Sequence, residues 1–384
     1  MSSRHKDPHN RESYISAASL LLEYRNFIDS HDILFRINTE HNCWPVMRLY
    51  CEQIEGIPDV MKALTMLHAG SQIDFERALF CSWMSLVIAA NARLDAVHQR
   101  AIFLAGLFQD LGKHAVDQDI QNFISKVNGS YISQLDSNAL GDSHPLISST
   151  FLEGLFTDVE GLTDLVLHHH ARDDGSGFPH HVGESQLKLD NQILIIANEV
   201  SDRVDRMGGH NRLPACIPSL RLGAFSYFKK AHEAWLNVLE PFCDEDIDLD
   251  VTRTMLNLEQ KRALLSKLLA CLLSVSGELL RYDFDLKVHA LRSIIQKLAH
   301  LFAETGVLHR DIFKVSDDVT PQMLQESAML FQALPELLYQ AESLVSALMS
   351  ARKFEFNQSL LLDAQMLLGR CNRALDPHRP GIFR

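Results

Sequence analysis

The sequence predicts an all-α protein, on two patterns and one absence. Thr320 followed by Pro321 is typical of a helix start, and an apolar pattern then runs from Met323 towards Met349, interrupted by Pro335. The strand-like alternation of apolar and polar residues is nearly absent. The second helical pattern is one wide apolar stripe of leucines at helical spacing, at Leu264, Leu265, Leu268, Leu269, Leu272 and Leu273.

The composition is that of a globular protein. Of the 384 residues, 46% are hydrophobic and 22% are charged, which is enough apolar content to bury a sizeable core in two or three domains. The net charge of −13, from 36 basic and 49 acidic residues, argues against general nucleic-acid binding.

The cysteines and the apolar runs lead us to expect a cytoplasmic protein. The seven cysteines include no C-x-x-C pair, so zinc ribbons and thioredoxin-type motifs find no support, and we expect reduced thiols. Residues 1–25 mix histidines and charged residues before any apolar run, unlike a secretion signal. No uncharged apolar stretch reaches the roughly 20 residues of a membrane span, so we expect no span.

Three regions follow one another along the chain. We expect residues 1–70 to form an N-terminal helical segment and residues 71–240 to form a histidine-rich domain. An acidic, turn-like run begins at Cys243, and residues 245–384 then form a C-terminal set of long amphipathic helices.

Histidines and carboxylates gather in four fragments, each at or near the end of an expected helix. The fragments contain Asp110, His144, the run His168–His170, and the segment from Asn198 to Asp202. Metal sites in helical proteins are built from ligands on facing helices, and a carboxylate with several imidazoles suits Zn, Mn or Fe. Neighbouring histidines on one helix point about 100° apart, so both reach one metal only near a helix end. The Gly175–Gly177 loop that follows is expected to end that helix.

One of these fragments is specific enough to resemble a known family. The block His169–Pro179 resembles the "HHExxDGxGYP" signature of the HD-GYP family, bacterial metal-dependent phosphodiesterases that cleave cyclic di-GMP, within the broader HD superfamily. The other fragments look like the family's "HDxGK", "HP" and "ILxVADxxDA" segments, in the same order, over roughly residues 75 to 210. The resemblance implies an HD-domain-like helical bundle, here with additional N- and C-terminal helices.

The departures from the family pattern fall on one side of its metal site. One family metal is held by an early His, by the His and Asp of "HD", and by the Asp of "VAD". Here no His occurs near Leu79 to Cys81, Gln109 replaces the second His, and Asn198 replaces the last Asp. Amides bind first-row metals weakly, so we expect this metal to be missing, with Glu76 as the one substitute oxygen considered.

The ligands of the second family metal are all retained. The resemblance implies that Asp110, His144, His169 and His170 bind one Fe, Mn or Zn ion per chain, with Asp110 as a terminal ligand.

The resemblance also implies residues that act on a substrate. It gives Asp110 and Lys113 as catalytic candidates, because the family lysine lies close to a substrate phosphate. Lys113, Arg172 and the backbone at Gly175 and Gly177 could hold a phosphate of cyclic di-GMP or a related nucleotide.

Three functions are compatible with this pattern. The first is a degenerate HD-GYP-like signalling protein that binds a metal and a cyclic dinucleotide with weak or no hydrolysis. In that protein the C-terminal helices would contact a protein partner or form a homodimer. The second is an active metal-dependent phosphodiesterase with an altered metal centre, since one metal still lowers the pKa of water while a two-metal site does so better. The third is a helical scaffold without metal.

Overall fold

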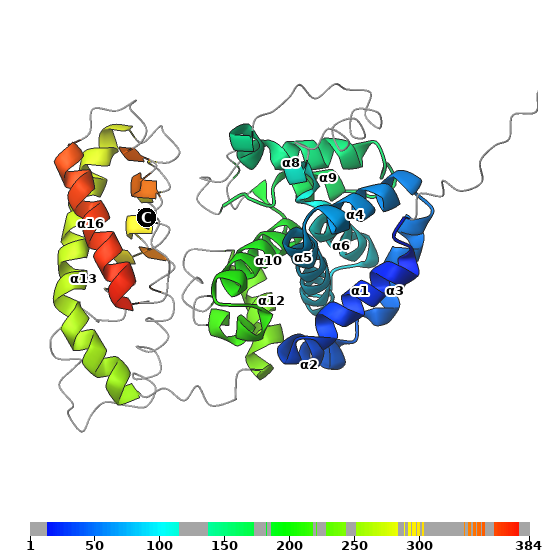
Figure 1. The fold of residues 1–384 in the computed structure, drawn as a ribbon, viewed down its shortest axis with the longest axis horizontal. Coiled ribbons are helices and arrows are strands. Elements are labelled where there is room, and N and C mark those ends of the chain that lie inside the picture. Colours follow the sequence, from blue (N-terminus) through cyan, green and yellow to red (C-terminus); the bar gives the residue numbers. More distant parts are fainter. Residues whose placement is uncertain are drawn as a thin grey trace, which may run out of the picture. The chain divides into compact units, whose positions relative to one another are not determined.

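The computed structural model describes residues 14–114, 137–172, 182, 186–217, 220, 228–242, 251–282 and 357–375, with separate positions between 288 and 302 and between 334 and 349. The all-α prediction is confirmed, because every regular element in these ranges is a helix (Figure 1). The chain divides into two compact units, an N-terminal unit of residues 1–170 and 188–211 and a C-terminal unit of residues 171–187 and 212–384.

The N-terminal unit is a bundle of helices. In order they are α1 (Ala17–Asp29), α2 (Asp32–His41), α3 (Trp44–Glu55), α4 (Pro58–Gly70), α5 (Gln72–Asn91), α6 (Ala96–Phe108), the short 3₁₀ helix η1 (Leu111–His114), α8 (Ser137–Glu153), α9 (Leu162–Leu167) and α10 (Leu189–Arg206). A further 3₁₀ helix, η3 (His210–Cys216), follows α10.

Helices α5 and α6 form the core of this unit. Every residue of α5 from Ala78 to Ala89 is buried, as is every residue of α6 from Ala101 to Phe108, because helices that are apolar all round can only be stable inside a protein. Gly106 lets the two backbones approach closely, since a Cβ at this position would lie 2.6 Å from the Ser82 Cα. The core is therefore a close-packed helix pair, and the functional residues lie at its ends.

The first helices pack around α5 in the same unit. The Tyr24 hydroxyl and the Ser82 hydroxyl are 2.6 Å apart, and the Trp83 indole donates to Asn38 Oδ1 at 3.2 Å. These buried hydrogen bonds satisfy the polar groups of α5 that face α1 and α2. The boundary expected near residue 70 stays a prediction, although residues 14–70 share one compact unit with α5–α10.

The C-terminal unit contains α12 (Lys229–Leu239), η5 (Glu240–Phe242), α13 (Val251–Leu279), η6 (Leu280–Tyr282) and α16 (Gln358–Leu375). The leucine stripe of α13 is core, as expected, although it is wider than the buried face: Leu273 is 49% exposed. Side chains from 288–302 and 334–348 complete this core against α13 and α16, with Leu265, Leu268, Leu272, Leu291, Leu338 and Leu368 fully buried.

One segment of the described chain is long and apolar enough to cross a membrane. It is Lys261–Tyr282, at the end of α13 and in η6. From the sequence we expected no membrane span, but by length and composition this segment could be one. A core helix passes the same criterion, and Leu265, Leu268 and Leu272 of this segment are buried in the C-terminal core.

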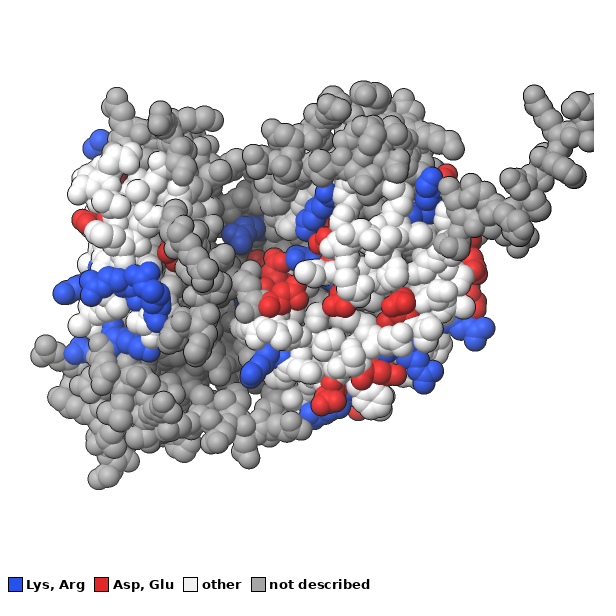
Figure 2. All heavy atoms as spheres, in the orientation of Figure 1, with Lys and Arg blue, Asp and Glu red and all other residues white. Residues whose placement is uncertain are grey.

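Charged side chains are mixed over the surface that can be described. On the face shown in Figure 2, acidic and basic groups of the N-terminal unit are interspersed and form no continuous basic stripe. This distribution agrees with the net charge of −13 in giving no support to a nucleic-acid surface there.

Candidate metal centre

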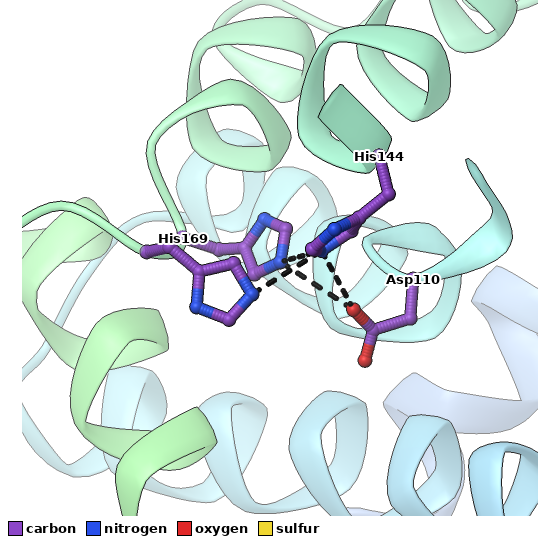
Figure 3. Close-up of side chains that lie close together, drawn as sticks. Asp110, His144 and His169 are labelled. Carbon is purple, nitrogen blue, oxygen red and sulfur yellow. Dashed lines mark hydrogen bonds and ion pairs between the residues drawn. The ribbon is translucent and has the colours of Figure 1, made fainter. Parts of the chain in front are cut away.

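Four side chains from three separate parts of the N-terminal unit meet at one point. Asp110 follows the end of α6, His144 lies in α8, and His169 and His170 follow the end of α9. One ligand atom from each of the four lies within 4.8 Å of all the others. Figure 3 shows Asp110, His144 and His169 pointing toward one another. The sequence fragments separated by up to 60 residues therefore build one cluster.

The spacing of these ligand atoms fits a metal ion. His144 Nε2 lies 3.2 Å from His169 Nε2, 3.2 Å from His170 Nε2 and 3.2 Å from Asp110 Oδ1, and His169 Nε2 lies 3.5 Å from Asp110 Oδ1. Four ligands at about 2.0–2.1 Å from a tetrahedral ion are about 3.3–3.4 Å from one another. The cluster thus has the size of one first-row metal site.

The histidine pair reaches one point because α9 ends just before it. The helix stops at Leu167, and His168 is its C-cap residue. His169 and His170 are therefore free of helical geometry, which is the condition that the sequence argument required. The two ring centroids lie 4.2 Å apart, with an angle of 45° between the ring planes.

Hydrogen bonding and burial prepare His169 as a neutral ligand. Its Nδ1 lies 2.6 Å from the Val166 carbonyl oxygen, so Nδ1 carries the proton and Nε2 presents a lone pair to the cluster. Burial lowers the pKa of His169, and burial together with His169 lowers the pKa of His170. Neutral imidazoles are the form that binds metal. Lone pairs that face each other at 3.2 Å repel unless a proton or cation lies between them.

Asp110 supplies a buried negative charge. Burial alone would raise its pKa, but Lys113, His144, His169 and Arg77 together hold that pKa well below the usual range. Lys113 Nζ lies 2.8 Å from Asp110 Oδ1. Neither carboxylate oxygen has a donor in good hydrogen-bond geometry among the described residues, although both have ion-pair neighbours. A buried carboxylate that has ion-pair neighbours but no well-aligned hydrogen-bond donor is suited to binding a cation.

A close backbone contact fixes Asp110 beside His144. The Gly112 amide donates to Ser148 Oγ at 2.8 Å, and a Cβ on Gly112 would lie 2.4 Å from the His144 carbonyl oxygen. Only glycine allows η1 to lie this close to α8. The glycine of the "Gly-Lys" pair is therefore required for packing. It lets η1 lie against α8, and this contact keeps Asp110 beside His144.

On the other side of Asp110 the structure contains amides and an arginine. Gln109 Nε2 donates to Asn198 Oδ1 at 2.8 Å, and Asn198 Nδ2 donates to Gln109 Oε1 at 2.9 Å. Arg77 Nε lies 3.2 Å from Asp110 Oδ2, and its Nη1 pairs with Asp202. Arg77 was missed by sequence reasoning; the signal available was a charged residue directly before the apolar run of α5.

Known proteins resemble the chain in the region of this cluster. The family model for the HD domain matches residues 64–213. By this match, residues 64–213 are similar to the HD-domain family. The chain is 25% identical over 153 residues to a 3'3'-cGAMP-specific phosphodiesterase of Vibrio cholerae, covering 39% of this chain and 34% of that protein. It is 25% identical over 132 residues to a cyclic di-GMP phosphodiesterase of Pseudomonas aeruginosa, covering 34% of this chain and 30% of that protein.

The chain spans about a third of the length of these curated relatives. No solved structure matches the chain at a significant level.

The HD domain brings together some of the predicted residues and not others. Asp110 and Lys113 are in contact, with Lys113 Nζ 2.8 Å from Asp110 Oδ1. Arg172 is half-buried and belongs to the C-terminal unit, while Gly175 and Gly177 lie outside the described residues. Glu76, the one substitute oxygen considered, accepts a hydrogen bond from Gln72 and is not among the four residues of the cluster.

Proposed function

We propose that this HD domain binds one divalent transition metal, Fe, Mn or Zn, and a cyclic dinucleotide, and that it acts in signalling with weak or no phosphodiesterase activity. The observation that carries the proposal is the convergence of three imidazole nitrogens and one carboxylate oxygen within 4.8 Å. The other described polar side chains around Asp110 are two amides, a lysine and an arginine, which do not serve as metal ligands of comparable strength.

The relatives support the choice of ligand. Both named relatives are phosphodiesterases of cyclic dinucleotides, one specific for 3'3'-cGAMP and one for cyclic di-GMP. Such ligands carry two phosphodiester charges, and Lys113 offers an ammonium group beside the cluster, with its side chain 32% exposed. Arg172, Gly175 and Gly177 complete the proposed phosphate-binding set.

The chain's own groups favour binding over turnover. When bound, a metal ion supplies Lewis acidity toward a phosphoryl oxygen and lowers the pKa of water. Lys113 orients a phosphate, and Asp110 balances the positive charge. A two-metal clamp would stabilise both the attacking and leaving oxygens, and each 1.36 kcal/mol of lost stabilisation slows the reaction tenfold. Asp110 and Lys113 therefore remain the catalytic candidates of a slow enzyme.

The second candidate is an active cyclic-dinucleotide phosphodiesterase with an altered metal centre. The specific observation in its favour is that both named relatives are phosphodiesterases and that the Asp110–Lys113 contact is in place. Turnover separates the two functions, since binding is common to both.

The C-terminal unit is our candidate for the interaction surface. Four large apolar side chains of α13, η6 and α16 are about half exposed: Leu273, Leu280, Leu362 and Met366. We infer that these helices form a homodimer in the cytoplasm, and the molar mass in solution by light scattering tests this.

The experiment that tests the main proposal measures binding and turnover on one preparation. Metal-loaded protein is titrated with cyclic di-GMP and with 3'3'-cGAMP in a calorimeter, and product is followed by chromatography. We expect binding that is lost in the His169→Ala/His170→Ala variant, with little or no product. The matched control is Arg48→Gln, which removes an exposed ion pair with Glu52 far from the cluster in sequence. Rapid turnover would establish the second candidate, and absence of binding would exclude both.

A further inference from the structure

Arg77 contacts the oxygen of Asp110 that the histidines do not use. His144 and His169 lie nearest to Asp110 Oδ1, whereas Arg77 Nε lies 3.2 Å from Oδ2. The two oxygens of one carboxylate therefore face two different positive partners. Oδ1 is turned to the metal cluster, and Oδ2 is turned to a guanidinium group.

Two of the guanidinium nitrogens are hydrogen-bonded, and the third, Nε, is the ion-pair neighbour of Asp110. Its Nη1 pairs with Asp202 Oδ1, and its Nη2 donates to Asn198 Oδ1 at 3.2 Å. The side chain is only 12% exposed. Burial would lower the pKa of Arg77, but Asp110 and Asp202 keep it raised, so the group stays charged. Arg77 is thus a fixed, permanent cation inside the domain.

The two amide side chains beside Arg77 already accept hydrogen bonds on their oxygens. Asn198 Oδ1 accepts from both Gln109 Nε2 and Arg77 Nη2, which uses its two lone pairs. Gln109 Oε1 accepts from Asn198 Nδ2. Burial raises the pKa of Cys81 to about 12, which favours the neutral thiol. The amides of Gln109 and Asn198 are hydrogen-bonded to each other, and Asn198 also accepts from Arg77.

We propose that Arg77 is a built-in substitute for a second metal ion, and that its guanidinium limits the centre to one metal per chain. This inference rests on the proposed function, because it assumes that the histidine cluster binds metal. A guanidinium at 3.2 Å from Oδ2 occupies the space in which a second ion would have to share Asp110, and its charge repels that ion. Arg77 is not itself a metal ligand in this proposal: it acts through its charge and its contact with Asp110 Oδ2.

The test compares the number of metal ions per chain in four proteins. The wild type and Arg77→Ala retain the native amides. The double variant Gln109→His/Asn198→Asp adds an imidazole and a carboxylate beside Asp110, and the triple variant also carries Arg77→Ala. Each is reconstituted with Mn²⁺, and the metal content is measured by elemental analysis. Electron paramagnetic resonance then distinguishes an isolated Mn²⁺ from a magnetically coupled pair.

We expect about one Mn²⁺ in the wild type, in Arg77→Ala and in the double variant, and about two, magnetically coupled, in the triple variant, because only the triple variant has both ligands and space. A coupled pair in the double variant would overturn the inference, since Arg77 would then be no obstacle. One ion in a folded triple variant would overturn it as well. No metal in the wild type would instead refute the proposed function on which the inference rests.

A second measurement keeps the inference falsifiable if the triple variant does not fold. Arg77→Ala alone removes a positive charge near the cluster, while Lys113 still pairs with Asp110 Oδ1. We expect it to bind the single Mn²⁺ about tenfold more tightly than the wild type, because the repulsion from the guanidinium is gone. Arg48→Gln, which neutralises an exposed arginine, should leave the affinity unchanged. Equal or weaker binding by Arg77→Ala would contradict the proposed role.

Discussion

The backbone at Gly112 lies against the backbone at His144 so closely that any side chain at residue 112 would collide with it. The Cβ of an alanine there would lie 2.4 Å from the His144 carbonyl oxygen and 3.0 Å from its Cα. This contact joins η1 to α8 and thereby joins Asp110 to His144. The geometry of the metal centre therefore depends on a glycine that has no ligand atom of its own.

Gly112→Ala should destabilise the N-terminal unit and loosen the centre. Overpacking of this kind costs about 1–3 kcal/mol of unfolding free energy, measured by urea denaturation. Metal affinity should fall as well, because Asp110 moves relative to His144. Gly56→Ala is the matched control: the nearest atom to its Cβ would be 3.8 Å away, so stability should hardly change. Equal stability of the two variants would show that η1 can move away at no cost.

The buried His210 should make stability depend on pH. Burial lowers the pKa of His210 to about 4, and His31 makes a smaller contribution in the same direction. The His210 ring packs against Phe27 and Phe80. The unfolded chain takes up a proton near pH 6.5, but the folded chain does not until about pH 4. The unfolding free energy should therefore fall as pH drops through this window, by up to about 3 kcal/mol from this residue.

His210→Phe removes that titration and keeps a flat ring. We expect a smaller loss of stability between pH 6.5 and 4 than in the wild type, measured by urea denaturation at several pH values. His98→Gln serves as the control, because His98 is an exposed side chain paired with the N-cap Asp95. If the wild type and His210→Phe have parallel pH profiles, His210 does not titrate in this window.

Lys113→Gln should separate ligand binding from metal binding. The ammonium group competes for Asp110 Oδ1 at 2.8 Å, so its loss should leave metal affinity equal or higher. The affinity for a cyclic dinucleotide should fall about tenfold, or about 1.4 kcal/mol, because a charged phosphate contact is lost. Calorimetric titrations with metal and with the nucleotide measure both values. Unchanged nucleotide affinity would remove Lys113 from the binding site.

A buried polar pair should be important to the C-terminal unit alone. The Asn372 amide donates to the Glu342 carboxylate, and both side chains are buried. Asn372→Ala leaves that carboxylate without this donor, which should cost about 1–3 kcal/mol. Ser274→Ala is the control, because its hydroxyl bonds only within its own exposed helix surface. Metal content should be normal in both variants, and a loss of metal in Asn372→Ala would contradict the independence of the two units.

The ligand cluster was predictable because the motif residues carry both their chemistry and their positions. His169 and His170 converge since α9 ends at Leu167, before the histidines, whereas the glycines downstream had predicted a helix that carries them. Arg77 was not predictable in the same way. It is adjacent to Glu76, but helical neighbours point about 100° apart, so Glu76 faces Gln72 while Arg77 faces Asp110. Which of the two enters the core depends on how α5 packs against α10. That packing is a property of the tertiary structure and cannot be read from the α5 sequence alone.

The helical class followed from the leucine spacing, yet the width of the buried face did not. Leu272 is fully buried, whereas the adjacent Leu273 is 49% exposed. Side chains from residues 288–302 and 334–348 decide which leucines are covered, and their placement against α13 is not encoded in the α13 sequence itself. Periodicity therefore identified the helix, and only the assembled core identified its inner face.

The central claim is that Asp110, His144, His169 and His170 bind one metal ion. The most direct test is the metal content of the purified and reconstituted protein by elemental analysis, beside the His169→Ala/His170→Ala variant. The account predicts about one Fe, Mn or Zn ion per chain in the wild type and none in a variant that keeps its helical content. A wild-type protein that binds no metal after reconstitution, or a variant that retains it, would contradict the account.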